Sequence, residues 1–360
     1  MRNTVASLRE TRDQLLDPHR STAVLRSHVE TREAIDYLLN CTSWRVSATS
    51  EIKEGIANLK IRYQISATTH NRCVSCVLKK YFPFFVGEPR RKFGAILNRR
   101  AEREMAALVL LRAHTGPVKV PTLLSTNREA DWNLMLAIEP ALPVSYLEFG
   151  QIEALGKQLA DFRSLRGFPS DLVSENLVND TISYRQRLGR VDLLPKCIAR
   201  SLGTYLADPY VGERTFVHGD VTTKNLLCTP VNGCLWLLDF EQANYGDPLS
   251  DLGFLASDLA VAELRREADG WLKRVEQRLS SLFESYWKAL NRVSTDLEER
   301  RVFLHFVLGC LYRSETLQFL PGPLPKGASA RLRHLAMALL SAESPTLLHV
   351  SAFDECPATA

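Results

Sequence analysis

Hydrophobic positions recur every three or four residues along much of the chain, a period typical of amphipathic helices. This repeat predicts helices at residues 7–16, 22–39, 95–113, 152–165, 177–188, 195–206, 260–293 and 297–312. Alternating or continuous apolar runs, bounded by Gly, Pro and polar turns, instead predict strands. Such runs lie at residues 44–52, 57–66, 73–85 and 132–138, and a further strand-rich stretch covers 215–245.

The order of these elements predicts an α+β chain in which a β-rich part precedes a mainly helical part. We expect a helical N-terminal extension over residues 1–43 and a small β-rich lobe over residues 44–141. A larger helical lobe should follow over residues 142–345, and the Pro- and Ser-containing residues 346–360 should form a loose tail.

Composition narrows the class of protein without identifying it. The chain has 360 residues, of which 45% are hydrophobic and 24% charged, as in ordinary globular proteins. A net charge of +4 on so long a chain is no electrostatic case for nucleic acid. No apolar run approaches the length of a membrane span, and no secretory signal is visible, so we expect a cytoplasmic protein with no membrane partner. The eight cysteines are scattered, which favours free thiols.

The residues that indicate chemistry follow a short apolar run in the later strand-rich stretch. This run leads into His218-Gly219-Asp220, and Asn225 stands five positions after Asp220. A second apolar strand ends at Asp239, so a hairpin would bring the three polar residues to one end. Phosphoryl transfer needs an aspartate that accepts the acceptor's proton, and amide and carboxylate oxygens that hold Mg²⁺. His218 is expected to be a core or orienting residue.

The upstream half of the chain holds groups that could bind a nucleotide. Lys79 ends a predicted strand and could reach phosphates, and Glu104 on the next helix could form an ion pair with it. Lys80 is the alternative to Lys79, and Glu102 is the alternative to Glu104. Because side chains alternate along a strand, Lys79 and Lys80 point to opposite faces and only one of them can reach the phosphates. The loop that ends at Asn58 could cover the phosphates, but it contains a single glycine.

Several other polar residues near the motif are expected to be structural or solvated. Asp247 and Asp251 should be structural, and Asp251 should brace the loop through backbone hydrogen bonds. Lys224 is predicted to be a solvated loop residue, although it could approach a transferred phosphate. The basic pair Arg99-Arg100 and the segment 312–315 are interpreted as helix or loop surface. A substrate could contact residues 146–166, 180–187 or 312–315.

These motifs resemble the aminoglycoside phosphotransferase and choline kinase-like family of small-molecule kinases over residues 45–345. The resemblance rests on the stretches 218–225, 239–241 and 246–252. It implies a two-lobed fold of the protein-kinase type, with Asp220 as catalytic base and Lys79–Glu104 as the phosphate-anchoring pair. It also implies metal ligands, which would be Asn225, Asp239 and, as a possible accessory, Glu241.

The small lobe is most similar to methylthioribose kinase, through residues 75–84 and 100–108. Asn225 and Phe240 depart from that enzyme, which usually has Ser and Pro there, and both point to the wider choline kinase-like group.

The sequence thus predicts an ATP-dependent, Mg²⁺-dependent kinase whose acceptor is a hydroxyl of a small metabolite, with a sugar or sugar-like alcohol as the best match. It does not distinguish ATP from GTP. The rivals are a nucleotide-binding pseudokinase scaffold and an atypical protein kinase. Only eleven residues separate Asp239 from Asp251, too few for a long activation segment. The N-terminal helices could form a homodimer contact or pack on the small lobe.

Overall fold

The computed structural model describes residues 44–54, 58–67, 73–81, 99–112, 114–128, 131–172, 214–266, 269–316 and 325–341. Several predictions lie outside these residues. They are the N-terminal helices, the helices at 177–188 and 195–206, the third strand beyond residue 81, the start of the helix at 95, and the C-terminal tail.

The described chain divides into two compact units. The first holds β1 (Trp44–Glu54), most of β2 (Asn58–Ala67) and most of β3 (Cys73–Tyr81), in the order β1-β2-β3. All three strands were predicted from their apolar runs. The apolar side chains of Ile61 and Leu78 are fully buried. The second unit contains the end of β3 and every later described residue, and the lobe boundary predicted at residue 141 remains a prediction.

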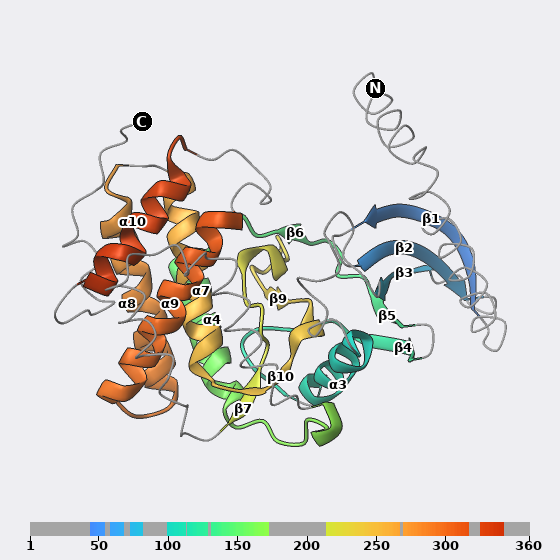
Figure 1. The fold of residues 1–360 in the computed structure, drawn as a ribbon. Coiled ribbons are helices and arrows are strands. Elements are labelled where there is room, and N and C mark those ends of the chain that lie inside the picture. Colours follow the sequence, from blue (N-terminus) through green and yellow to red (C-terminus); the bar gives the residue numbers. More distant parts are fainter. Residues whose placement is uncertain are drawn as a thin grey trace. The chain divides into compact units, whose positions relative to one another are not determined.

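The second unit begins with a helix and a small antiparallel pair of strands (Figure 1). The helix is α3 (Arg100–Arg112), and the strands are β4 (Leu123–Asn127) and β5 (Trp132–Leu136). The backbone N–H of Tyr81 at the end of β3 donates to the carbonyl of Asp131, 2.9 Å away, just before β5. β4 was not predicted, because its five residues alternate too weakly to give a period-two signal.

Five further α-helices follow α3 in the described part of the second unit (Figure 1). They are α4 (Phe149–Phe162), α7 (Leu249–Arg266), α8 (Trp271–Ala289), α9 (Asp296–Thr316) and α10 (Ala328–Ser341). The predicted single helix at 260–293 is wrong, because that stretch holds the end of α7 and the whole of α8. Gly270, with φ at +65°, interrupts the right-handed helix just before α8. The helix α10 was not predicted.

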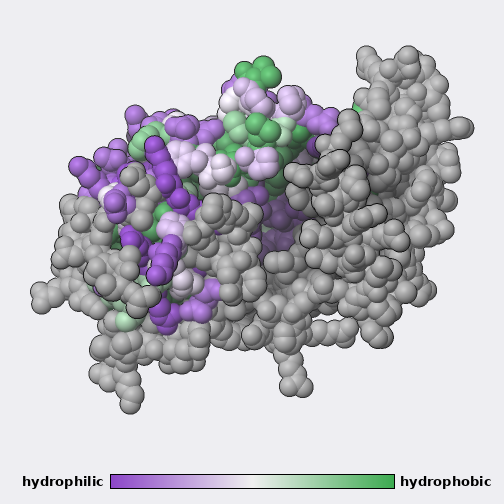
Figure 2. All heavy atoms as spheres, turned by 90° about the horizontal axis from the view of Figure 1, so that it is seen from above, coloured by the Kyte–Doolittle hydropathy of each residue, from purple (hydrophilic) through white to green (hydrophobic). Residues whose placement is uncertain are grey.

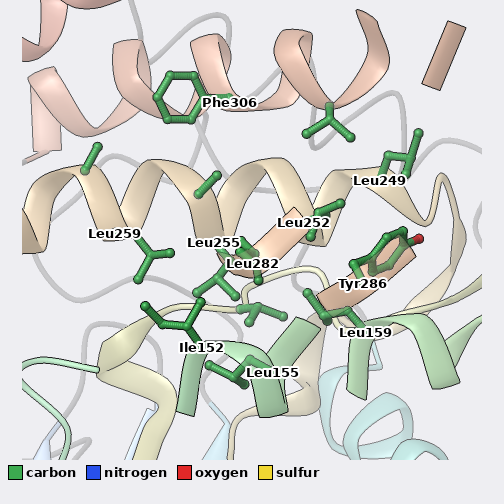
Figure 3. Close-up of a cluster of buried hydrophobic side chains, with 14 of the residues drawn as sticks. Ile152, Leu155, Leu159, Leu249, Leu252, Leu255, Leu259, Leu282, Tyr286 and Phe306 are labelled. Carbon is green, nitrogen blue, oxygen red and sulfur yellow. The ribbon is translucent and has the colours of Figure 1, made fainter. Parts of the chain in front are cut away.

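The apolar faces of α4, α7, α8 and α9 meet in one core (Figure 3). Leu252, Leu255 and Leu259 of α7 recur at helical spacing and are almost fully buried. Gly253, also on α7, lies so close to α9 that an added Cβ would stand 2.7 Å from the Val302 carbonyl oxygen. The tight packing of α7 against α9 gives a rigid support to the loop at residues 218–223, which contacts α7.

Two small sheets hold the segment that contains His218, Asp220 and Asn225. β7 (Thr215–Val217) pairs with β10 (Asn244–Gly246), whereas β8 (Leu226–Cys228) pairs with β9 (Leu235–Leu237) and with β6 (Leu142–Pro143). The strands on either side of the polar loop therefore pair with other strands and not with each other, which corrects the predicted hairpin. Asn225 and Asp239 still lie at one end of the β8–β9 hairpin, where the Leu238 N–H donates to the Asn225 carbonyl (2.9 Å).

Among the described residues, only a few large apolar side chains are exposed. On the face drawn in Figure 2, hydrophilic residues gather on one side of the described surface and a compact hydrophobic group protrudes beside them. None of the described helices is long and apolar enough to cross a membrane.

Candidate active site

A buried lysine is the centre of one cluster of charges in the second unit. Lys79, at the end of β3, is 2% exposed, and its Nζ lies 3.1 Å from Glu104 Oε1, 2.5 Å from Asp239 Oδ1 and 3.1 Å from Glu241 Oε2. Burial alone would lower the pKa of Lys79, but the three carboxylates outweigh it and raise the pKa above its ordinary value. The lysine therefore stays charged. Lys80, its rival, is partly exposed, as strand alternation predicts.

Glu104 holds this lysine from α3. Its carboxylate is buried and also accepts hydrogen bonds from the backbone N–H of Phe240 (3.2 Å) and the side chain of Asn133 (3.4 Å). Burial raises the pKa of Glu104, and the charge of Lys79 opposes that rise. Glu102, the alternative on the same helix, instead pairs with Arg99 at 2.7 Å. The predicted Lys79–Glu104 ion pair is therefore formed.

Arg100, which was not predicted as a site residue, belongs to the same cluster. It was assigned to a basic surface, but the side chain is 2% exposed and forms an ion pair with Glu241 Oε1. The preceding Arg99 has its own partners, Glu102 and Asp171. Both oxygens of Glu241 are thus occupied by cations, one by Lys79 and one by Arg100.

Two cations therefore face three carboxylates in this cluster, which leaves one formal negative charge in excess. No three His, Cys, Asp or Glu side chains of the described residues gather to hold a metal. The Asp239 carboxylate and the Asn225 amide nevertheless stand at one hairpin end, and both carry hard oxygen ligands of the kind that Mg²⁺ prefers. The excess negative charge and the two oxygen-bearing side chains both fit a magnesium ion.

The polar loop presents Asp220 with one carboxylate oxygen occupied. Oδ2 accepts from Asn225 Nδ2 (3.0 Å) and lies 3.0 Å from Lys224 Nζ. No described residue donates a hydrogen bond to Oδ1. The interpretation of Lys224 as a merely solvated residue is wrong: its side chain is 51% exposed, yet its ammonium is paired with Asp220. Asp220 stands four positions before Lys224, and this spacing permits an ion pair without requiring one.

His218 positions the loop and has the structural role that we expected. Its ring is buried, Nε2 lies 2.8 Å from the Leu238 carbonyl, and Nδ1 is 3.1 Å from the Asp220 backbone N–H. Since that N–H can only donate, Nδ1 accepts and Nε2 carries the proton. Gly219 has φ at +85°, and a Cβ there would lie 2.7 Å from the Gln242 carbonyl. Only glycine suits this turn.

Two aspartates on one face of α7 hold the backbone of this loop. Asp251 accepts from the N–H groups of His218 (2.6 Å) and Gly219 (2.8 Å), as predicted. Asp258, two helical turns further on, accepts from the N–H of Thr223 at 2.6 Å. Asp258 could not be recognised from the sequence, because an aspartate inside a helix is ordinarily a solvent-facing residue.

Buried basic residues of α9 neutralise acidic groups of this region. Arg313 Nη1 lies 2.9 Å from Asp258 Oδ1, and both side chains are buried, so the surface assignment of residues 312–315 is wrong for Arg313. Asp247, structural as expected, accepts from Arg301 (2.9 Å) and contacts His305 Nε2 (2.9 Å). Burial opposes ionisation of Asp247, but His305 and Arg301 outweigh it and lower its pKa.

The predicted phosphate-covering loop is not tested. Asn58 begins β2, but its side chain and residues 55–57 lie outside what the structure describes. The described cysteines Cys76, Cys228, Cys234 and Cys310 are free thiols, as predicted.

Comparison with known proteins defines the class of this chain. Residues 68–303 match the model of the phosphotransferase enzyme family, and the chain belongs to that family. This membership confirms the expectation of a phosphotransferase with an alcohol group as acceptor. No curated protein sequence matches the chain.

Solved structures show the fold. A choline/ethanolamine kinase family protein from Mesorhizobium loti is 17% identical, with a TM-score of 0.54 over 91% of this chain and 98% of its own. A choline kinase from Streptococcus pneumoniae is 17% identical, with a TM-score of 0.51 over 87% of this chain and 99% of its own. Aminoglycoside 2'-phosphotransferase-IIIa, solved as its GDP complex, is 15% identical, with a TM-score of 0.50 over 86% and 98%. The expected two-lobed, kinase-like α+β fold is confirmed.

Proposed function

We propose that this protein transfers the γ-phosphoryl group of ATP to a hydroxyl of a small metabolite, with a sugar or sugar-like alcohol as the acceptor. One observation carries the proposal. The carboxylate of Asp220 has donors on Oδ2 alone, from Lys224 and Asn225, and so presents Oδ1 to a substrate. A carboxylate held in this way is suited to accept the proton of a hydroxyl.

The reaction assigns a task to each charged group. Asp220 Oδ1 takes the hydroxyl proton while the hydroxyl oxygen forms a bond to the γ-phosphorus, and the bond from phosphorus to the β-phosphate oxygen breaks to release ADP. Lys79, held by Glu104, would bind phosphate oxygens of the nucleotide as a fixed positive charge. Lys224 keeps Asp220 in place.

Asn225 and Asp239 would hold Mg²⁺, which when bound would neutralise charge on the phosphates. We leave Glu241 out of this ligand pair, because both of its oxygens face cations. Asn58 and the loop before it remain proposed contacts of the nucleotide. The nucleotide is proposed as ATP, although one structural neighbour was solved with GDP, so GTP belongs in the same test.

The test is label transfer from γ-labelled ATP or GTP, with Mg²⁺, into a metabolite extract. The extract is supplemented with methylthioribose, choline, ethanolamine and an aminoglycoside. The wild type should label one small molecule, and Asp220→Asn should lower the rate by about 10²–10⁴-fold with an unchanged melting temperature. Equal rates in the two proteins would refute the role of Asp220. Label on protein alone would indicate a protein kinase, and no label despite stabilisation by Mg²⁺-ATP would indicate a pseudokinase.

A further inference from the structure

A cavity lies in the second unit, apart from the charged cluster. It has a volume of about 670 Å³ and is lined by one face of α3, the segment from His114 to Thr126, Gln158 of α4 and Trp236 of β9. None of Lys79, Glu104, Asp220, Asn225 or Asp239 lines it. A volume of this size suits a small molecule.

The walls of this cavity combine apolar and polar side chains. Val109 on α3 and Leu124 on β4 both line it, and they are 60% and 47% exposed, which is unusual for large hydrophobic side chains. Val109 follows Met105 by one helical turn, so both stand on the face of α3 turned to the cavity. Apolar surface of this kind favours a ligand with a hydrocarbon body.

The charged residues of the lining are all basic. Arg112, His114 and Lys119 line the cavity, and its lining includes no Asp or Glu. The Lys119 ammonium stands over the Trp236 ring, 5.5 Å from its centroid. The local charge therefore favours an anionic group on the ligand.

Two ring nitrogens of the lining residues are themselves shielded from solvent. Trp236 Nε1 is buried and has no hydrogen-bond partner among the described residues, so its N–H does not reach the cavity. His114 Nε2, also without a hydrogen bond in the described structure, stands 3.7 Å from Asp161 Oδ2.

We propose that this cavity binds an apolar molecule that carries one anionic group, at a site separate from that of phosphoryl transfer. The hydrocarbon body would contact Val109 and Leu124. The anionic group would lie among Arg112, His114 and Lys119.

Octanoate is the probe, and 1-octanol is the uncharged control of the same chain length. Calorimetric titration of the full chain should give a dissociation constant on the order of 1 mM or below for octanoate, and binding at least tenfold weaker for octanol. Saturating Mg²⁺-ATP should leave the octanoate affinity unchanged. Equal affinity for octanol, or competition with Mg²⁺-ATP, would overturn the proposal.

A pair of matched variants assigns the binding to this cavity. Val109→Glu places a carboxylate on the wall, whereas Val293→Glu makes the same change at an apolar residue that is 83% exposed and does not line the cavity. Because both positions are exposed, both variants should melt like the wild type. Val109→Glu should weaken octanoate binding at least tenfold and Val293→Glu should not. Identical affinities in the two variants would overturn the proposal.

Discussion

The buried pair Arg313–Asp258 offers the sharpest test of how the fold holds the polar loop that contains Asp220. Asp258 accepts from the N–H of Thr223 with Oδ2 and pairs with Arg313 through Oδ1. Both side chains are less than a tenth exposed. The substitution Arg313→Met keeps a long apolar stem but leaves Asp258 buried without its counter-charge. Asp258→Asn likewise leaves the buried guanidinium of Arg313 without its counter-charge.

Breaking one side of a buried ion pair costs about 3–5 kcal/mol in the free energy of unfolding, because the remaining charge stays desolvated. Arg313→Met also loses the contact of the guanidinium over the Phe254 ring, 4.6 Å to the centroid, worth about 2 kcal/mol for a desolvated pair. Replacing both partners removes both charges, and the introduced amide oxygen can still accept from Thr223. We expect the double variant to lie within about 2 kcal/mol of the wild type.

Urea unfolding at neutral pH, followed by circular dichroism, measures these differences. The surface pair Arg333–Glu315, with an N–O distance of 2.8 Å and side chains 28% and 29% exposed, is the matched control. Each single change there should cost less than about 1 kcal/mol. The phosphotransfer assay is run on the same proteins. The single changes at Arg313 and Asp258 should lower kcat, and the double variant should recover part of it.

The double-mutant cycle decides the result. Additive effects of Arg313→Met and Asp258→Asn, with a coupling energy below about 0.5 kcal/mol, would refute the reasoning that the two charges depend on each other. Unchanged kcat in both single variants would refute the view that the ion pair of Asp258 with Arg313 holds the loop in place.

Two further predictions follow from the described contacts. Lys224→Met should lower kcat about 10-fold or more, because the Lys224 ammonium contacts Asp220, and should change KM and stability little, because the side chain is half exposed. Lys224→Arg should restore most of the lost kcat. A raised KM with a normal kcat would contradict this prediction. Burial alone would raise the pKa of Glu298, but hydrogen bonds from Arg292 and Thr295 outweigh it and lower the pKa from 4.5 to about 2. Because the folded pKa lies below the unfolded one, the stabilisation is present above about pH 4.5 and is lost as the pH falls toward 2. Urea unfolding should therefore show a stability gap between wild type and Glu298→Gln at pH 5 that narrows by pH 3, and a constant gap would contradict the assignment.

The sequence by itself determined the features that depend on neighbours along the chain. The alternation that separates Lys79 from Lys80 is local, and so is the apolar period that predicts α4, α9 and the first three strands. The spacing from Asp220 to Asn225 is local as well. The motif also indicated the phosphotransferase class and the bracing role of Asp251, because a fixed backbone turn needs a nearby acceptor.

Only the tertiary structure decided the contacts between distant segments. Arg100 meets Glu241 and Arg313 meets Asp258 across large separations, and neither side chain differs in sequence from an ordinary solvated charge. The pairing of β7 with β10 likewise depends on which strand edges the packed helices leave available. Burial is a property of the whole fold, and so the same charged residue types that sequence reasoning assigns to the surface become the supports of the candidate active site.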